Sequence, residues 1–346
     1  MEKKDNSYSD NSIFKSIDPT SNDILSDLKG FDLQDLIISL DDYLIEYRKR
    51  INLEQYITIG LEIEFEHESK KIIENQIEDI FLNNPDWKMK EEYSLQRGGE
   101  IISPILRDTE ENWEDLKIIC SLMDNFQARE SDKCGSHIHV GSQTLGKQKQ
   151  SWMNFIKLWA IYENIIFRFA YGEYLNGRPK ITTYAYPISA ELLDCYKVLS
   201  QKRATLLEIL CAINKDKYQA VNFRNVIGTD CDKMIDYNTI EFRCPNGTLD
   251  PAIWQNNANF FIRLLLYSKS NKYNKDIIQR RERIIRDKIN DLHWYNEIYL
   301  EQALELCDMI FTNNLDKLNF LKQYLKSFQI CEDIHELKKG PVLTKK

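Results

Sequence analysis

The stretch Tyr56–Glu68, YITIGLEIEFEHE, alternates glutamates with large apolar residues and therefore predicts a β-strand with two unlike faces. Successive side chains in a strand point to opposite faces, so Glu62, Glu64 and Glu66 share one face at a spacing of roughly 7 Å. The opposite, apolar face consists of Leu61, Ile63 and Phe65. Because neighbouring like charges repel, the acidic row indicates either a bound cation or an exposed edge strand, and this segment alone favours neither.

Three further stretches have the same build. CGSHIHVG (Cys134–Gly141) places His137 and His139 on one strand face. TIEFRCPNGTLDP (Thr239–Pro251) does the same for Glu241 and Arg243, and SLQRGGEIISPIL (Ser94–Leu106) carries Glu100 after a Gly-Gly pair in a strand that Pro104 ends. Alone, His-x-His is more often a surface feature and Glu-x-Arg an ordinary ion pair. Together the four strands indicate one site, and carboxylates with a little imidazole suit Mg²⁺ or Mn²⁺ better than structural zinc.

The order of these motifs resembles that of a known family. Gly-x-Glu-x-Glu, Gly-Glu-x-x-Ser-Pro, Cys-Gly-x-His-x-His-x-Gly and Glu-Phe-Arg-x-x-Asn-Gly-Thr-Leu-Asp are similar to the amidoligases, a branch of the glutamine synthetase and glutamate-cysteine ligase superfamily, from Tyr56 to Leu266. The resemblance implies an α+β fold like the glutamine synthetase catalytic domain, with a curved antiparallel sheet backed by helices. It also implies an ATP-dependent carboxylate-amine ligase that uses two or more Mg²⁺ or Mn²⁺ ions.

The resemblance also implies roles for individual residues. Metal ligands carried over by position are Glu62, Glu64, Glu100, His137 and Glu241. His137, Glu241 and Arg243 are expected on the nucleotide side, where His137 is similar to a phosphate-binding histidine and Arg243 to the arginine that steadies the transferring phosphoryl group. Glu100, His139 and Arg243 are the expected catalytic residues, with Glu66 or Glu100 as the base that deprotonates the amine.

The chain departs from the family pattern just before the Gly-Glu-x-x-Ser-Pro motif. Many members carry Asp-Gly-Ser where this sequence reads Glu92-Tyr93-Ser94. Arg178 and Asn222 are candidates for the substrate side. Arg178 lies where relatives carry an arginine near the substrate, and Asn222 ends the segment YQAVN, which resembles the segment that leads into the last motif. A surface loop and a strand cap are the equally weighted alternatives for these two residues.

Three functional hypotheses follow from the motifs. The favoured one is a ligase that transfers the γ-phosphoryl group of ATP to a carboxylate and lets an amine attack the acyl phosphate. A glutamate-like donor is the superfamily default, and the acceptor is ammonia, an amino acid, a polyamine or a peptide or protein amine. The alternatives are a metal-dependent hydrolase or phosphodiesterase, and an inactive module that binds nucleotide or peptide.

Composition narrows the class of partners. The 346 residues carry a net charge of −8 with a pI near 5.4, which argues against nucleic acid or an anionic membrane as a partner. The one basic run, Gln279–Lys288, favours a solvated helix face over a polyanion site. Eight cysteines without Cys-x-x-Cys spacing, together with the lack of a signal-like or membrane-spanning apolar run, favour a reduced cytoplasmic protein.

Periodicity divides the chain into five parts. We expect a disordered tail (1–22), an N-terminal helical segment (23–51), a catalytic domain (52–270), a C-terminal helical extension (271–337) and a second tail (338–346). Within the catalytic domain, helices are predicted over Ile72–Asn84, Glu110–Arg129 and Trp152–Tyr171. The last has apolar residues around most of its circumference, so its aromatic side chains are predicted to lie in the core rather than to bind a ring.

Overall fold

A computed structural model describes residues 21, 23–28, 30–67, 69–81, 86–92, 94–95, 97–131, 133–171, 184–194, 198, 201, 203–228, 230–235, 238–288 and 299–325. In these residues the chain forms one six-stranded antiparallel sheet with helices around it, which confirms the α+β class. The strand order is β2-β3-β1-β4-β6-β5. The strands are β1 (Ile59–Glu66), β2 (Lys88–Glu91), β3 (Gly98–Ile102), β4 (Ser136–Gly141), β5 (Val221–Asn222) and β6 (Thr239–Phe242).

Helices connect and cover these strands. They are α1 (Ile24–Asp27), α2 (Leu33–Ser39), α3 (Lys70–Ile80), α4 (Glu110–Asn125), the 3₁₀ turn η1 (Ser142–Thr144), α5 (Lys149–Tyr171), α7 (Ser189–Asp194), α9 (Leu206–Ile213), α10 (Arg224–Ile227), α11 (Pro251–Lys269), α12 (Lys275–Ile285), α13 (Leu300–Ile310) and α14 (Asn314–Leu325). The predicted helices correspond to α3, α4 and α5, within a few residues at their ends. None of the described helices is long and apolar enough to cross a membrane.

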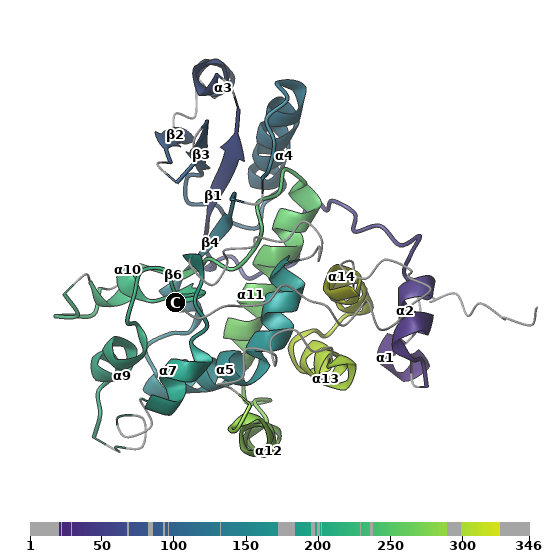
Figure 1. Ribbon diagram of the computed structural model, residues 1–346, viewed down its shortest axis with the longest axis vertical. Coiled ribbons are helices and arrows are strands. Elements are labelled where there is room, and N and C mark those ends of the chain that lie inside the picture. Colours follow the sequence, from purple (N-terminus) through teal and green to yellow (C-terminus); the bar gives the residue numbers. More distant parts are fainter. Residues whose placement is uncertain are drawn as a thin grey trace, which may run out of the picture.

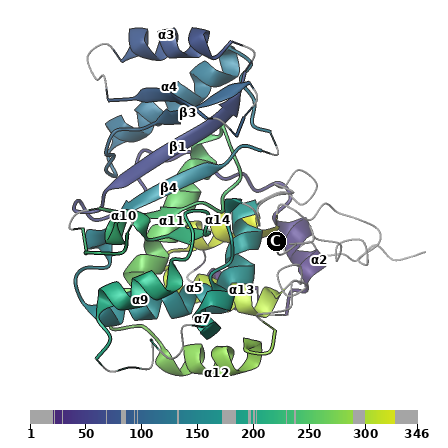
Figure 2. The ribbon, with the colours of Figure 1, turned by 60° about the vertical axis from the view of Figure 1, so that its left-hand side comes forward.

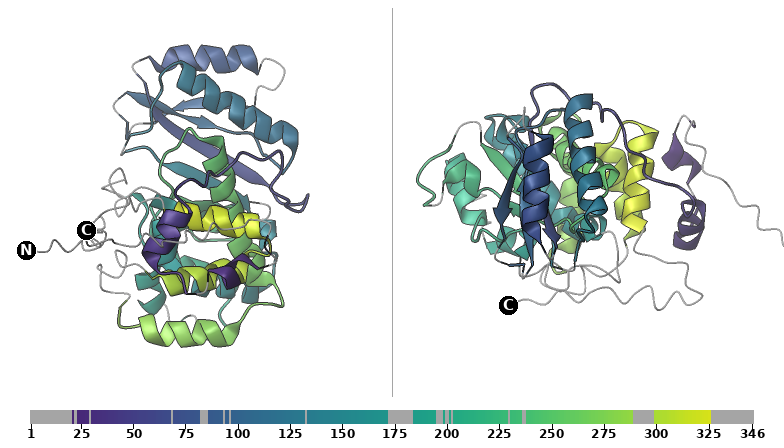
Figure 3. Two further views of the ribbon diagram at one scale, coloured as in Figure 1. Left: turned by 90° about the vertical axis from the view of Figure 1, so that its right-hand side faces the viewer. Right: turned by 90° about the horizontal axis from the view of Figure 1, so that it is seen from above.

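Helices α4, α11, α13, α14, α1 and α2 lie in layers on one side of the sheet (Figure 1). In Figure 1, α4 and α11 are next to the strands, α13 and α14 lie beyond them, and α1 and α2 are outermost. Figure 2 shows β3, β1 and β4 side by side, and the view from above in Figure 3 shows the same succession of layers. One face of the sheet is therefore backed by helices, which leaves the other face for the polar side chains of the motifs.

Capping residues mark the N-termini of α4 and α11, the two helices next to the sheet. The Thr109 side chain accepts a hydrogen bond from the Asn112 backbone N–H at 3.2 Å and so caps α4. Asp250 caps α11 in the same way, and Pro251 follows at the first helical position, where its missing N–H costs nothing. Both helices therefore begin where the sequence provides a cap.

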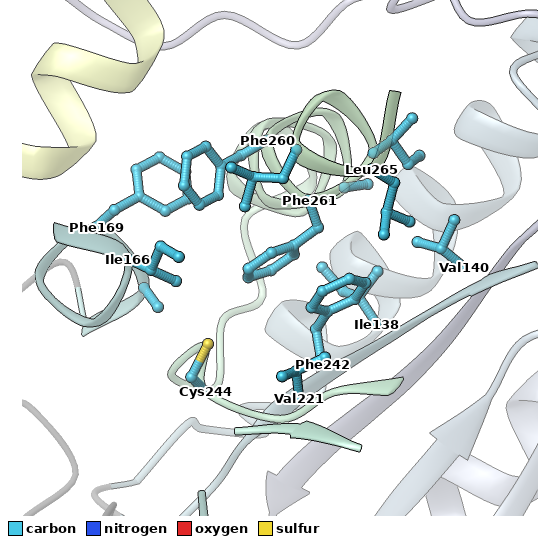
Figure 4. Close-up of a cluster of buried hydrophobic side chains, with 14 of the residues drawn as sticks. Ile138, Val140, Ile166, Phe169, Val221, Phe242, Cys244, Phe260, Phe261 and Leu265 are labelled. Carbon is cyan, nitrogen blue, oxygen red and sulfur yellow. The ribbon is translucent and has the colours of Figure 1, made fainter. Parts of the chain in front are cut away.

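The core lies between the apolar face of the sheet and the long helices α5 and α11. Figure 4 shows Ile138, Val140 and Phe242 of the sheet directed toward Phe261 and Leu265 of α11. The Phe242 and Phe261 rings stack with centroids 4.4 Å apart. The aromatic residues predicted as core on α5 are all buried, namely Trp152, Phe155, Trp159, Phe167 and Phe169.

The N-terminal segment differs from the helical prediction. Helices α1 and α2 account for its first half, whereas residues 42–51 are not helical. Tertiary hydrogen bonds hold this part: Tyr43 Oη donates to Asn319, the Arg48 backbone N–H to Gln255, and the backbone N–H of Ile51 to Asp108. The periodic apolar pattern was misleading here because contacts with distant helices outweigh local helix propensity; Leu44, assigned to the helical stripe, is 74% exposed.

The C-terminal part is helical as predicted as far as it is described. The basic run lies on α12 and its continuation, but Arg281 is buried rather than solvated. Its guanidinium pairs with Glu305 at 2.8 Å and with Glu301 at 3.2 Å, and both acids belong to α13. The two predicted tails and residues 326–337 lie outside the described residues, apart from residue 21.

Candidate functional site

Strand pairing brings the polar faces of the four motifs together. Across the sheet, Glu64 is opposite Glu100 and Glu62 is opposite His137. His139 is opposite Glu241. Directly opposed residues of an antiparallel pair lie on the same face with Cβ atoms about 4.5–5.5 Å apart. One face thus carries the row of acids and histidines, and the other carries buried residues such as Ile63 and Ile138.

Glycines make room for this row. Gly60 is opposite His139, and a Cβ at Gly60 would lie 3.3 Å from the Cβ of His139. A Cβ at Gly98 would lie 2.0 Å from the Phe65 carbonyl oxygen, so β3 can approach β1 only with glycine there. The glycines that flank the motifs in sequence therefore serve close packing around the site.

Glu62 is the hub of the cluster. Its Oε2 lies 2.8 Å from His137 Nδ1, and its Oε1 lies 3.0 Å from His139 Nε2. Burial alone would raise the pKa of Glu62, but the hydrogen bonds and positive charge of the two histidines outweigh it and hold the pKa well below its usual range. Glu62 is therefore a carboxylate with a histidine on each side.

Glu100 experiences the opposite environment. Burial and the nearby negative charges of Glu62 and Glu64 raise the pKa of Glu100 to about 8. Glu64 itself is almost fully buried and accepts a hydrogen bond from the Gly135 backbone N–H. Carboxylates crowded in this way repel one another, and a divalent cation would relieve the repulsion.

The cluster offers three groups whose ligand atoms lie within 4.8 Å of one another. They are Glu62–Glu100–His137, Glu62–His139–Glu241 and Glu64–Glu92–Glu100. A second observation points to a cation. His137 Nε2 is buried without a hydrogen-bond partner and lies 3.5 Å from Glu64 Oε1, so a metal-type ligand atom is directed into the acidic row. Oxygen-rich groups with one imidazole fit Mg²⁺ or Mn²⁺.

Glu92 is a member of this cluster that sequence reasoning missed. It lies just after β2, and its charge contributes to the raised pKa of Glu100. In the sequence it stands out only as a departure from Asp-Gly-Ser. The signal that identifies it is that a carboxylate is kept where relatives carry Asp.

Glu241 and Arg243 of the last motif lie at one edge of the site, together with Asn222. Asn222 Nδ2 donates to Glu241 Oε2 at 2.9 Å, and Arg243 Nη1 contacts Glu241 Oε1. The Arg243 Nε donates to the Tyr184 carbonyl oxygen at 3.3 Å, and the guanidinium lies 5.8 Å from the centre of the Tyr218 ring. Arg243 and Asn222 therefore both hold Glu241, the late ligand of the predicted set.

Within the described residues, the structure brings together all the predicted metal ligands, the predicted catalytic residues and one of the two predicted substrate-side residues. Those residues are Glu62, Glu64, Glu100, His137, His139, Glu241, Arg243 and Asn222. Glu66 is on the same face at the end of β1, outside the three groups. Arg178 lies outside the described residues, so its substrate-side role stays a prediction.

Comparison with known proteins shows the family of the chain. Residues 64–265 match the family model described as "Putative amidoligase enzyme", and the chain belongs to that family. The matched range includes Glu64, Glu100, both histidines, Glu241 and Arg243, and it begins just after Glu62. A search of curated proteins gave no match.

Proposed function

We propose that this protein is an ATP- and Mg²⁺-dependent carboxylate-amine ligase with a glutamine synthetase-like catalytic sheet. The observation that carries the proposal is the opposition of Glu64 to Glu100 and of Glu62 to His137 on one strand face, in a chain of the amidoligase family. Such a face provides ligands for more than one divalent ion. Arg243 at its edge provides a cation for a phosphoryl group.

The residues that would hold the ions are Glu62, Glu64, Glu100, His137 and Glu241, joined by Glu92. Bound Mg²⁺ or Mn²⁺ would neutralise the charges of the ATP phosphates and of these carboxylates. The pairing of Glu62 with both histidines orients the imidazoles toward the same face before any ligand binds. The pair His139–Glu62 raises the pKa of His139 against the effect of burial, so this histidine can carry a positive charge beside the substrate.

The reaction has two steps. A carboxylate oxygen of the donor attacks the γ-phosphorus of ATP, the bond to ADP breaks, and Arg243 contacts the equatorial oxygens of the phosphoryl group in transfer. The amine nitrogen then attacks the acyl carbon, phosphate leaves, and the amine proton passes to a carboxylate, Glu66 or Glu100. We expect a glutamate-like donor and ammonia, an amino acid, a polyamine or a peptide amine as acceptor, with Arg178 and Asn222 on the substrate side.

Trapping with hydroxylamine tests the proposal. Hydroxylamine replaces the amine, so a panel of carboxylate donors with ATP and Mg²⁺ should give a hydroxamate and ADP together, and neither should form without the metal. Cleavage of a phosphodiester or peptide without ATP would support a metal-dependent hydrolase instead. Nucleotide binding with no turnover of any donor would support a binding module.

A matched pair of variants links the reaction to this face of the sheet. Glu62→Gln should abolish hydroxamate formation. Glu91→Gln on β2, at the edge of the same sheet, should leave it unchanged, because Glu91 is exposed, is opposite Gly99 on the other face, and pairs with Lys70. Equal loss of activity in both variants would contradict the assignment.

A further inference from the structure

One buried carboxylate lies outside the acidic row and has no part in the reaction above. Glu163 is fully buried on α5, directly after Tyr162, where the helix departs from helical dihedral angles. Its Oε1 accepts hydrogen bonds from Trp159 Nε1 at 2.8 Å and from the Ile188 backbone N–H at 2.7 Å. Its Oε2 accepts one from the Ser189 backbone N–H at 2.9 Å. Glu163 thus attaches the segment Tyr184–Ser189 to α5.

That segment continues the hydrogen-bonded ladder of the site. The Tyr186 backbone N–H donates to the Tyr218 carbonyl oxygen, and the Tyr186 carbonyl accepts from the Ala220 N–H, both at 2.7 Å. The Ala220 carbonyl in turn accepts from the Arg243 backbone N–H at 2.9 Å. A rigid backbone connection therefore runs from the residues fixed by Glu163 to Arg243.

The same segment also supports the Arg243 side chain. Its first residue, Tyr184, offers the carbonyl oxygen that accepts from Arg243 Nε. The Tyr184 ring packs edge-on against the Tyr218 ring with centroids 6.0 Å apart, and Tyr218 lies next to the guanidinium. The Tyr184 carbonyl oxygen and the Tyr218 ring that this segment supports thus both contact the Arg243 guanidinium group.

We infer that Glu163 is a positioning residue for Arg243, acting through the segment Tyr184–Ser189. The inference rests on the phosphoryl-contact role proposed above for Arg243. A carboxylate suits the task because adjacent backbone donors need an acceptor oxygen each. A glutamine side chain has one acceptor oxygen and one donor NH₂ group, so its NH₂ group would face a backbone N–H of the segment. The segment would then shift, and a small displacement of a catalytic group such as Arg243 has a large effect on rate.

A chemical probe tests the inference without relying on activity. Phenylglyoxal modifies accessible guanidinium groups, and mass spectrometry of the Arg243 peptide gives the modification rate. Glu163→Gln should raise that rate several-fold, because Arg243 loses its fixed surroundings. The matched control is Glu305→Gln, which removes a carboxylate that accepts from the neighbouring Tyr162 Oη at 2.5 Å but has no link to Arg243. An unchanged rate in Glu163→Gln, or an equal rise in both variants, would overturn the inference.

Steady-state kinetics give a second measurement, because a residue that only stabilised the fold would not lower kcat selectively. In the hydroxamate assay Glu163→Gln should lower kcat by about tenfold or more with little change in KM for ATP. In an Arg243→Lys background, Glu163→Gln should lower kcat little further, because the guanidinium group that Glu163 positions has already been removed. Additive losses would contradict the inference. If wild-type protein forms no hydroxamate while Arg243 reactivity responds as expected, the proposed function fails and the positioning role stands.

A second variant covers the case in which Glu163→Gln does not fold. Ser189→Pro removes both the backbone N–H and the hydroxyl that hydrogen-bond to Glu163, keeps the buried carboxyl group, and lies at the first residue of α7, where proline is tolerated. It should raise Arg243 reactivity in the same direction, by a smaller factor. No rise in this folded variant would contradict the proposed connection.

Discussion

Two groups of carboxylates in this protein have opposite environments. Near the α12–α13 contact, Glu305 accepts hydrogen bonds from Arg281 at 2.8 Å, Arg280 at 3.1 Å and Tyr162 at 2.5 Å. Burial alone would raise the pKa of Glu305, but the Arg281 contact outweighs it and the pKa is lowered. At the sheet centre Glu100 faces other carboxylates instead, and its pKa rises to about 8.

The difference shows which group serves stability. Glu305 is paired with cations, so it joins α12, α13 and α5 at little electrostatic cost. At the sheet centre the histidines stabilise the Glu62 carboxylate, but the burial of Glu100 beside Glu62 and Glu64 costs folding free energy in the metal-free protein. Structures keep such unfavourable charge where function requires it. On this comparison the sheet face, rather than the α12–α13 contact, is the candidate functional face.

The largest expected effect tests the hub of that face. Glu62 belongs to two of the three ligand groups, whereas Glu92 belongs to one. Glu62→Gln should lower ADP formation by a factor on the order of 10³ or more, and Glu92→Gln by less, because fewer ion contacts are lost. Steady-state ADP release at saturating Mg²⁺ measures both. A larger loss in Glu92→Gln would show that Glu62 is not the hub.

The next effect concerns the cation at the edge of the face. Arg243→Lys keeps the positive charge and loses the planar fork that can contact two phosphoryl oxygens. We expect kcat to fall by a factor on the order of 10² with little change in KM for ATP. A variant with normal kcat and weaker ATP binding would instead make Arg243 a ground-state nucleotide contact.

The smallest effect is on stability, and it should differ in sign between the two groups. Glu305→Gln should destabilise the fold by about 1–3 kcal/mol, because it leaves buried Arg281 with weaker partners. Glu100→Gln should stabilise the metal-free protein by about 1 kcal/mol, because it removes like-charge repulsion. Thermal and urea unfolding in the presence of a chelator measure both. Destabilisation by Glu100→Gln would mean that the repulsion is already compensated.

Unfolding measured at several pH values gives a further test of the Glu100 environment. A carboxyl group whose pKa rises from 4.5 to about 8 on folding binds its proton more tightly in the folded state. Its contribution to stability is present below pH 4.5 and is lost as the pH rises through about 8, with a slope of at most about 1.4 kcal/mol per pH unit. The raised pKa of His139 acts in the same direction. Glu100→Gln should flatten this decline, and Mg²⁺ should oppose it.

Much of the site could be predicted from the sequence because a strand has a side-chain period of two. The alternation around Glu62 and around His137 assigns each residue to a face without knowledge of the fold. Helices α3, α4 and α5 were predictable for a related reason, since caps and long apolar stripes act locally. The helical prediction was wrong for residues 42–51, where hydrogen bonds to Asp108, Gln255 and Asn319 hold a segment that is not helical.

By itself the sequence determined which side chains share a face, because that depends only on neighbouring residues. Tertiary structure alone decided which faces meet, since the register between strands depends on turns, on packing and on glycines such as Gly60 and Gly98. That register places Glu64 opposite Glu100, while the fold brings Glu92 into the cluster and joins Glu163 to the segment whose Tyr184 contacts Arg243. These are contacts between residues far apart in the chain, and no local pattern encodes them.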